Sequence, residues 1–360
     1  MRKSIYVLHE RSTKEHFIAL ESYALLNNVE IKYREFLILR FFAKSILRLD
    51  HKLFFQQLKN VQFFITALFT KKRTIIIGIA PLDFHLLILI FFLKKHELFY
   101  FTSWCDWSGN SFPKNFSFDS TRLKKTWSNF LKNHIKGAFC VTEASAKSLQ
   151  KNFDLSCPVA VVSHSINNSI TPIKRINSQS GSKKLNLIYV GRLVENKGIK
   201  ELLSLNKNLD KELFSLKIVG DGPLKNIVQE ASRAYSNIDY VGYVKSKRKL
   251  FNLYCQSDIQ LLFSKKTLDN TWEELFGIVI IEAMYCGVPT IATSHVGPKS
   301  IIDHGVNGFL VDEKNIIEET KKILEEKLFM NKEFIDETQL KAKKYYKTHL
   351  VKKWGEILDA

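Results

Sequence analysis

The sequence predicts an α/β protein of two doubly wound, Rossmann-like domains, and three observations support this fold class. The chain has 360 residues, more than one domain usually holds, although a single large α/β domain of this size also occurs. Hydrophobic residues make up 45% and charged residues 25%, the balance of a chain that buries extensive cores. Short apolar runs alternate with helical patterns along the chain, which is typical of parallel sheets covered by helices.

Five strands are expected in the first half, each a short apolar run that a helical pattern separates from the next. The unit after the third strand shows how the sequence marks such boundaries. Gly78 and Pro81 end the strand, Asp83 can cap a helix, and basic residues after Leu93 suit that helix's negative end. The expected strands are Ser4–Leu8, Glu30–Leu37, Thr74–Ile79, Leu98–Ser103 and Phe139–Thr142.

A domain linker is expected at Thr171–Lys184, where Ser, Asn, Gln, one Pro and one Gly break the hydrophobic periodicity. We therefore place an N-terminal domain at 1–175, a C-terminal domain at 185–338, and a helix at 339–360 that packs back toward the first domain. Six strands are expected in the second domain: Leu185–Val190, Leu216–Val219, Ile238–Val241, Ile259–Leu262, Thr290–Ala292 and Gly308–Val311.

The compartment is expected to be the cytoplasm. The five cysteines show no Cys-x-x-Cys spacing, which argues against a disulfide framework and against a Cys-rich zinc site. No secretory signal opens the sequence, and its longest apolar runs are far shorter than the ~20 residues that span a bilayer.

The formal charge of +18 is concentrated in the first half of the chain. Residues 1–180 hold 26 Lys and Arg against 12 Asp and Glu, a net +14, whereas residues 181–360 hold 28 against 24, a net +4. Such a field favours polyanions, an anionic membrane face or phosphorylated small molecules, and the alternative is that it only keeps the protein soluble. Nucleic acid is not an expected partner, because no helix-turn-helix, zinc-finger or RNA-binding signature occurs.

The stretch Tyr33–Arg73 interleaves aromatic and aliphatic side chains with Lys and Arg. Basic amphipathic helices of this kind can lie on anionic bilayers. The alternative is an ordinary stripe of core residues flanked by solvated cations. The sequence is therefore compatible with peripheral binding of the protein to the inner face of the cytoplasmic membrane, and the alternative stays open.

A first site motif follows the strand that ends at Val190. Gly191 and Arg192 open a short loop, Lys197 lies five residues further on, and a helix is expected to start at Gly198–Ile199. Helix N-termini carry unpaired N–H groups and partial positive charge, so two added cations make a diphosphate site. The alternative is a loop with two solvated cations.

A second motif holds two carboxylates eight positions apart. Glu274 lies in a loop after a strand, Gly277 permits close backbone approach, and Glu282 falls inside an apolar helix. A carboxylate there is costly unless hydrogen bonded, and the vicinal hydroxyls of a ribose would satisfy it. The alternative is a structural carboxylate paired with a nearby cation.

These motifs belong to a longer series. Gly-Arg-Leu-x-x-x-Lys-Gly at 191–198 is followed by Val-Gly-Asp-Gly-Pro-Leu, Val-Gly-Tyr-Val, a Glu-x7-Glu motif that continues into Glu-Ala-Met-x-x-Gly-Val-Pro-Thr-Ile-Ala, and Gly-Val-Asn-Gly-Phe-Leu-Val. From Leu185 to Val311 the chain resembles the retaining glycosyltransferases of family four, of the bacterial surface-polysaccharide type. The resemblance implies the GT-B fold, in which two Rossmann-like domains flank a cleft.

The resemblance also implies residue roles, with the donor on the C-terminal domain and the acceptor on the N-terminal one. Arg192 and Lys197 match the diphosphate-binding pair, Glu274 the residue beside the donor sugar, and Glu282 the residue on the ribose hydroxyls. Glu274, Arg192 and Lys197 are the implied catalytic residues. The implied donor-binding set is Gly191, Arg192, Lys197, Tyr243, Val244, Glu274, Phe276, Gly277, Ile278 and Glu282, with Tyr243 and Val244 beside the nucleobase.

Neither a cofactor nor a metal is implied, and a nucleoside-diphosphate sugar is the co-substrate. Two cations and a helix N-terminus would stabilise charge on the departing nucleoside diphosphate without a metal. The chain also contains no Asp-x-Asp motif, which agrees with a metal-independent donor site. On the acceptor side the chain departs from the family. His9–Lys14 replaces a common Gly-Gly turn, and Phe101–Trp107 replaces a stretch that often holds a His. Ser103, Trp104 and Asp106 are the acceptor-side candidates.

The expected function is the transfer of a sugar from a nucleoside-diphosphate sugar to a glycan or lipid-linked acceptor in lipopolysaccharide or capsule synthesis. In the account expected for a retaining enzyme, the acceptor hydroxyl attacks on the leaving-group face and Glu274 steadies the sugar without becoming a nucleophile. Two alternatives stay open: a nucleotide-sugar epimerase on a GT-B scaffold, and a non-catalytic polyanion-binding protein.

Overall fold

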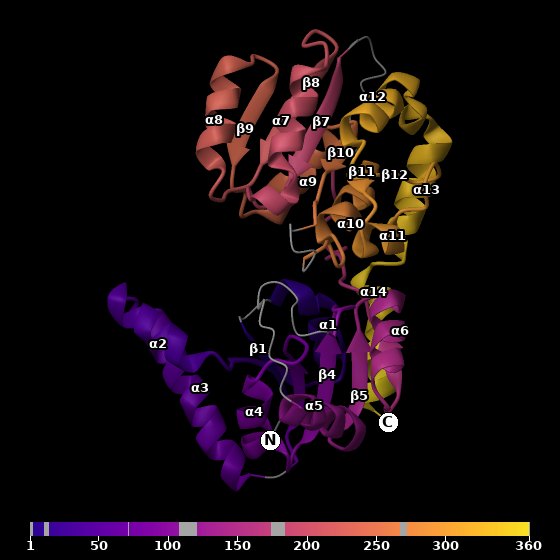
Figure 1. Ribbon diagram of the computed structural model, residues 1–360. Coiled ribbons are helices and arrows are strands. Elements are labelled where there is room, and N and C mark those ends of the chain that lie inside the picture. Colours follow the sequence, from indigo (N-terminus) through magenta and orange to yellow (C-terminus); the bar gives the residue numbers. More distant parts are fainter. Residues whose placement is uncertain are drawn as a thin grey trace. The chain divides into compact units, whose positions relative to one another are not determined.

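The computed structural model describes residues 3–10, 14–70, 72–107, 121–173, 184–266 and 272–359. The chain forms two compact units, one of Met1–Ser165 with Lys347–Ala360 and one of Ile166–Tyr346. Each unit holds one parallel sheet with helices packed against it (Figure 1). The predicted α/β class with two Rossmann-like domains is therefore confirmed. The units divide nearer the N-terminus than the predicted linker, and the second unit extends beyond residue 338.

The first unit contains a six-stranded sheet in the order β2-β1-β3-β4-β5-β6. All five predicted strands are present, although the fifth begins four residues earlier than expected. The short sixth strand was not predicted, because its three residues follow Pro158 and are only half-buried. The strands are β1 (Ser4–His9), β2 (Glu30–Glu35), β3 (Thr74–Gly78), β4 (Glu97–Thr102), β5 (Ile135–Cys140) and β6 (Val159–Val161).

Helices cover both faces of this sheet. Successive strand residues point to opposite faces, so neighbouring aromatic residues of β4 pack on helices of opposite faces. Tyr100 packs on Trp127 of α5, whereas the neighbouring Phe101 stacks on Trp354 of α14. The helices are α1 (Ile18–Leu26), α2 (Ile38–Leu47), α3 (His51–Phe69), α4 (His85–Leu93), α5 (Thr121–Asn133), α6 (Glu143–Asn152) and α14 (Lys347–Leu358), with a short 3-10 turn at Lys14–Phe17. As predicted, the Asp83 carboxylate accepts a hydrogen bond at the start of α4, from the N–H of His85 at 2.9 Å.

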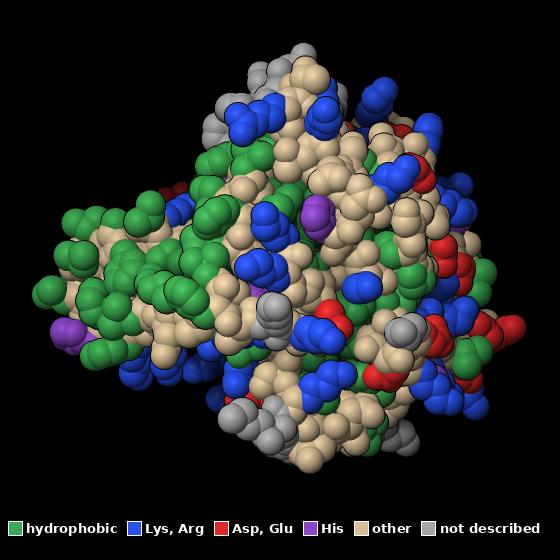
Figure 2. Space-filling model, turned by 90° about the horizontal axis from the view of Figure 1, so that it is seen from below, with side chains coloured by type: hydrophobic (Ala, Val, Ile, Leu, Met, Phe, Trp, Pro, Cys, Tyr) green, Lys and Arg blue, Asp and Glu red, His purple; other side chains and the backbone are tan. Residues whose placement is uncertain are grey.

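Helices α2 and α3 form an antiparallel arm that projects from the sheet (Figure 1). Phe42 and Phe54 pack together across the arm, with ring centroids 5.4 Å apart. At its base Gln57 donates to the buried Glu35 of β2 at 2.9 Å and accepts from Asn60 at 3.0 Å. Figure 2 shows hydrophobic side chains gathered over this arm, with Lys and Arg side chains along one edge.

The second unit contains a six-stranded parallel sheet in the order β12-β11-β10-β7-β8-β9, and all six predicted strands are present. The strands are β7 (Leu185–Val190), β8 (Phe214–Val219), β9 (Ile238–Gly242), β10 (Ile259–Leu262), β11 (Thr290–Thr293) and β12 (Phe309–Val311). The helices are α7 (Ile199–Lys207), α8 (Lys225–Ala234), α9 (Lys247–Cys255), α10 (Ile278–Tyr285), α11 (Val296–Ile301), α12 (Ile316–Glu326) and α13 (Lys332–Lys343), with 3-10 turns at Glu195–Lys197 and Leu328–Met330.

The C-terminal helix predicted at 339–360 is two helices. Residues 339–343 complete α13, and α14 begins only at Lys347. The break lies at Tyr345, whose carbonyl accepts from the N–H of Ile166 at 2.8 Å and whose hydroxyl donates to the carbonyl of Ser300 at 3.3 Å. Helix α14 packs on α1 in the first unit, where the Tyr23 hydroxyl donates to Asp359 at 2.5 Å.

Within the described part of the chain, no helix has the length and the hydropathy that crossing a bilayer requires.

Candidate functional site

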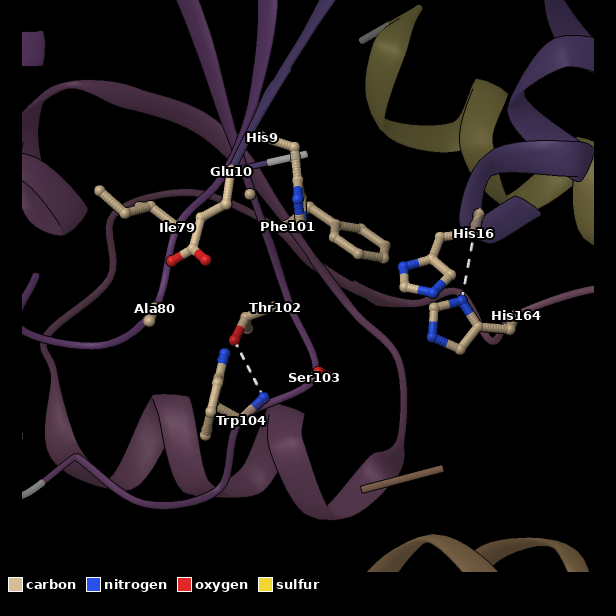
Figure 3. Close-up of a pocket in the computed structure, with 11 residues that line it drawn as sticks. His9, Glu10, His16, Ile79, Ala80, Phe101, Thr102, Ser103, Trp104 and His164 are labelled. Carbon is tan, nitrogen blue, oxygen red and sulfur yellow. Dashed lines mark hydrogen bonds between the residues drawn. The ribbon is translucent and has the colours of Figure 1, made fainter. Parts of the chain in front are cut away.

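A cavity of about 190 Å³ opens at the carboxyl ends of β1, β3 and β4 in the first unit (Figure 3). Two acceptor-side candidates, Ser103 and Trp104, line it, and the Trp104 N–H donates to the Thr102 hydroxyl at 3.1 Å. The third candidate, Asp106, is exposed and is not one of its lining residues. Trp107 is buried in the core behind them. The structure thus places two of the three candidates together.

Three histidines and a carboxylate on the cavity wall were not predicted: His9, Glu10, His16 and His164. The rings of His16 and His164 lie 4.5 Å apart, although the two residues are 148 positions apart in the chain. Burial lowers the pKa of His16, and burial with the neighbouring His16 lowers the pKa of His164 well below its usual value. Neutral imidazoles can both donate and accept hydrogen bonds, as sugar hydroxyls require.

The second site occupies the carboxyl ends of the strands of the second unit, where ligands of open α/β sheets bind. After β7, the Tyr189 hydroxyl donates to the carbonyl of Arg192 at 2.9 Å. The N–H of Leu193 donates to the carbonyl of Asp221, in the loop after β8, at 3.0 Å. These bonds fix the loop that begins at Gly191 and leave the Arg192 side chain exposed to solvent.

Helix α7 starts after Gly198, as predicted, and the backbone there requires a glycine. Gly198 has φ +68°, and a Cβ on it would lie 1.9 Å from the carbonyl oxygen of Phe263, at the end of β10. This close approach brings Lys197 to the loop that follows β10. The loop after β7 and the loop after β10 are thereby held together.

Lys197 and Glu274, two of the implied catalytic residues, form an ion pair with exposed side-chain fractions of 19% and 12%. The Ser264 hydroxyl donates to the same Glu274 carboxylate at 2.9 Å. The Lys197 ammonium also lies 5.0 Å from the ring centroid of Trp272. Burial alone would raise the pKa of Glu274, but the Lys197 charge and the hydrogen bonds from Lys197 and Ser264 outweigh it and lower that pKa. Glu274 is therefore a carboxylate at neutral pH.

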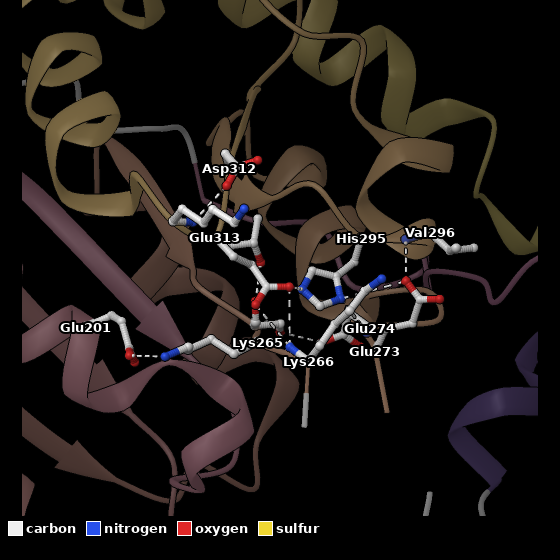
Figure 4. A network of polar contacts seen from close by, with 12 residues as sticks. Glu201, Lys265, Lys266, Glu273, Glu274, His295, Val296, Asp312 and Glu313 are labelled. Atoms are coloured by element: carbon white, nitrogen blue, oxygen red, sulfur yellow. Dashed lines mark hydrogen bonds and ion pairs between the residues drawn. The ribbon is translucent and has the colours of Figure 1, made fainter. Parts of the chain in front are cut away.

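A buried histidine holds the backbone at Glu274 (Figure 4). His295, in the loop after β11, accepts from the N–H of Glu274 at its Nδ1, at 3.1 Å, and its Nε2 lies 2.9 Å from Glu313 Oε1. Burial lowers the pKa of His295 more than the neighbouring carboxylates raise it. Glu313, after β12, also accepts from the N–H of Lys266 at 3.2 Å. The loops after β10, β11 and β12 are tied together by these contacts.

Helix α10 begins beside this pair. Gly277 caps it at φ +93°, and a Cβ on Gly277 would lie 2.8 Å from the Ile280 side chain. The buried Phe276 precedes the cap, and the half-buried Ile278 opens the helix. The N–H of Gly297 donates to the carbonyl of Glu274 at 2.8 Å, which holds the loop against α11.

Glu282 lies inside α10, as predicted, and is 6% exposed. Lys247, the first residue of α9, approaches it with Nζ 2.5 Å from Oε1. Tyr243 and Val244 follow β9, where Tyr243 is 73% exposed and Val244 is half-buried. Lys247 was not predicted as a site residue, because nothing in the spacing of Lys247 and Glu282 along the chain marks them as neighbours.

Several other residues of the site were also missed: Ser264, His295 and Glu313. The signal that was available is their position, since each follows a predicted strand by no more than three residues. In a parallel sheet these positions share one edge. The structure brings Lys197 and Glu274 into contact and places Gly191, Arg192, Tyr243 and Gly277 at that same edge.

Comparison with known proteins places this site in a family. Residues 171–346 match the family model of glycosyl transferases group 1. A 41.2 kDa protein in the cps region of Klebsiella pneumoniae is 31% identical over 154 residues, which cover 42% of this chain and 39% of that protein. A glycosyltransferase of Haemophilus influenzae is 26% identical over 252 residues, 68% of this chain and 67% of that protein.

The chain thus spans well under half of the first of these relatives and about two thirds of the second. Among solved structures, HepE of Anabaena in complex with UDP superposes with a TM-score of 0.68 at 17% identity, over 99% of each chain. This likeness shows the GT-B fold, as predicted. The match assigns residues 171–346, which make up nearly all of the second unit, to the glycosyl transferases group 1 family.

Proposed function

We propose that the chain is a retaining glycosyltransferase that moves a sugar from a nucleoside-diphosphate sugar to a glycan or lipid-linked acceptor. The observation that carries this proposal is the shielded Lys197–Glu274 pair, which lies beside the start of α10. Family membership of residues 171–346 supports it, and the UDP bound to the similarly folded HepE supports a nucleoside-diphosphate donor.

The diphosphate would meet positive charge on the second unit. Arg192 extends into solvent from its fixed loop, Lys197 is held at the end of β10, and the N-terminus of α10 adds the partial positive charge of its dipole. Fixed cations and dipoles stabilise the charge that develops on a departing nucleoside diphosphate. A divalent metal and a cofactor are therefore not needed in this proposal.

Transfer with retention would proceed on one face of the donor sugar. The bond from the anomeric carbon to the phosphate oxygen breaks, the bond to the acceptor oxygen forms on the same face, and the acceptor proton passes to a phosphate oxygen. Glu274 stays ionised because its pKa is lowered, so it would stabilise positive charge on the sugar ring. Its carboxylate is held by Lys197 and Ser264, which favours this electrostatic role over a covalent one.

The nucleoside would lie further along the same edge. Glu282 would accept hydrogen bonds from the ribose hydroxyls, with Lys247 compensating its charge in the free protein. Tyr243 and Val244 would flank the nucleobase, for which the exposed Tyr243 ring offers a stacking surface. The backbone of Phe276, Gly277 and Ile278 would contact sugar or phosphate.

The acceptor would bind to the first unit, at the cavity that Ser103 and Trp104 line. Asp106, the third candidate, is not one of the residues that line this cavity. Hydroxyl groups, neutral imidazoles and an aromatic ring are the groups that bind sugars. Surface-polysaccharide synthesis is proposed because a relative lies in a cps region. The proposed location is the cytoplasm, with peripheral attachment to the inner face of the membrane.

Thermal-shift screening tests the donor site. We expect sugars linked to one of UDP, GDP, ADP, CMP or dTDP to raise the melting temperature, because a ligand that binds the native state stabilises it. Lys197→Ala and Glu282→Ala should abolish the shift. Lys200→Ala is the matched control, since Lys200 pairs with Glu195 on the exposed surface. If no nucleotide sugar shifts the protein while polyanions do, the donor site is wrong and the polyanion-binding alternative gains.

Product analysis tests the reaction. Release of nucleoside diphosphate should require a glycan or lipid-linked acceptor, persist in EDTA, and yield a product whose anomeric configuration by NMR matches the donor. Conversion of the nucleotide sugar without any acceptor would instead indicate an epimerase. Loss of activity in EDTA with recovery on adding a divalent metal would contradict metal independence.

A further inference from the structure

The α2–α3 arm carries an apolar surface that the proposed reaction does not use. Its most exposed members are Leu39 at 86%, Leu47 at 84%, Phe69 at 83% and Leu49 at 80%. Soluble proteins rarely leave contiguous apolar surface of this kind uncovered unless something binds there. Helix α4 adds the exposed Ile88 and Phe91 beside α3, since α3 and α4 pack through Phe64 and Phe92.

The exposed apolar residues of α3 fall on one stripe of that helix. In α3, Phe55, Leu58, Ile65 and Phe69 recur at intervals of three, seven and four residues, which places them on one side at 3.6 residues per turn. The opposite side of α3 is the one that Gln57 and Phe63 bury against the sheet. The stripe therefore faces away from the domain rather than toward its core.

Cations accompany this stripe. Arg40 and Lys44 of α2 and Arg48, directly after it, recur every four residues, and Lys52 and Lys59 are exposed on α3. Across residues 38–73 the chain holds eight Lys and Arg and a single acid, Asp50. That acid caps α3, where it accepts from the N–H of Leu53 at 3.0 Å. The edge of cations beside the apolar surface is visible in Figure 2.

We infer that the arm inserts its apolar stripe into the headgroup boundary of an anionic bilayer, with the cation row on lipid phosphates. This deepens the proposed membrane location by naming the element and its mode of binding. An apolar stripe flanked by Lys and Arg is the pattern of interfacial helices, and it fits negative lipid by charge. A second copy of the arm fits less well, because it would oppose this cation row with the same cations and a single acid, Asp50.

Vesicle flotation of the full chain, without nucleotide, tests the inference. Wild-type protein should float with phosphatidylglycerol-containing vesicles and bind phosphatidylcholine vesicles far more weakly. Part of the binding should survive 1 M salt, where the Debye length is only about 3 Å, because the apolar stripe is inserted. Binding that salt removes completely would overturn insertion.

Matched variants distinguish vesicle binding through the arm from a general effect of exposed hydrophobic residues. Leu39→Ser with Leu47→Ser should weaken vesicle binding about tenfold or more, since two exposed leucines leave the interface. Leu25→Ser with Leu26→Ser is the control, because these residues of α1 are 77% and 75% exposed but lie outside the arm. Equal binding by both double variants, with unchanged melting temperatures, would overturn the inference.

Two further results keep this test distinct from the proposed chemistry. Lys197→Ala should bind vesicles like the wild type even when nucleotide binding is lost, so failure of the donor site leaves the inference standing. Concentration-dependent dimerisation that Leu39→Ser with Leu47→Ser abolishes, in protein that does not float with vesicles, would instead assign the stripe to a second copy.

Discussion

Glu274 is almost buried, yet it keeps its charge because Lys197 and Ser264 contact its carboxylate. The cost of removing the Glu274 and Lys197 charges from water opposes their mutual attraction, and the net stabilisation depends on pH. In the native protein the pKa of Glu274 is lowered, so its stabilising contribution is present above the unfolded-state pKa and is lost as pH falls through the native pKa. Removing the cation should reverse this dependence.

We expect Lys197→Met to lower the free energy of unfolding by about 3 kcal/mol at pH 8, because an unpaired carboxylate is left shielded from water. Without Lys197, burial raises the pKa of Glu274, so the native state binds a proton that the unfolded state has lost. The loss of stability should therefore shrink as pH falls toward 5. Urea titrations of both proteins between pH 5 and pH 8 measure it.

Lys200→Met provides the control for this prediction. Lys200 and Glu195 form a pair whose side chains are 61% and 71% exposed. Exposed pairs are screened by water and contribute little to stability, so this variant should resemble the wild type at every pH. A loss for Lys197→Met that is independent of pH would show that Glu274 does not titrate as argued.

At the scale of elements, the start of α10 depends on one glycine. Gly277 adopts φ +93°, and a side chain there would also press on Ile280. Gly277→Ala should therefore cost more than the roughly 1–2 kcal/mol of a left-handed alanine alone. Because the N-terminus of α10 would shift, nucleotide affinity should fall about tenfold or more by calorimetric titration.

Gly305→Ala is the control that separates the conformational cost of a left-handed alanine from the displacement of α10. Gly305 has φ +76°, and a Cβ on it would meet nothing within 4 Å. Gly305→Ala should show only the conformational cost and keep nucleotide affinity. Equal loss of affinity in both variants would mean that general destabilisation, rather than the position of α10, controls binding.

The strands and helices could largely be predicted from the sequence, because a buried parallel strand appears there as a short run of apolar residues. Leu185–Val190 and Ile259–Leu262 were predicted with the bounds that the structure has. Strand β6 was missed because its three residues are too few to show a period. The break between α13 and α14 was missed because the contacts that end the helix, with Ile166 and Ser300, are distant in sequence.

The site was predictable to the extent that its residues lie in continuous motifs. Lys197, Glu274 and Gly277 stand in such motifs, and the structure places them side by side. The contacts of Glu282 with Lys247 and of His16 with His164 join segments whose separation follows only from the fold. Local patterns carry no information about such pairs, so these contacts could not be predicted from the sequence.

At the scale of the whole molecule, the chain leaves its first unit and returns to it. Helix α14 comes last in sequence, yet its Trp354 is 2% exposed and packs on Phe139, with ring centroids 4.2 Å apart. Phe101, in the neighbouring strand β4, stacks on the same Trp354 ring, with centroids 6.2 Å apart. The second unit, Ile166–Tyr346, is thus inserted between two segments that form one core.

This arrangement predicts that Trp354→Ala weakens the first unit selectively. Truncating a buried tryptophan costs about 3–5 kcal/mol, and the lost contacts all lie in that unit. Hydrogen exchange should accelerate in β4, β5 and α1, while amides of residues 184–266 keep wild-type protection and nucleotide still binds. Lys352→Ala, an exposed change on the same helix, should leave exchange in both units unchanged. Acceleration spread equally over both units would show that they unfold as one cooperative body, and the two cores would then share their stability rather than hold it separately.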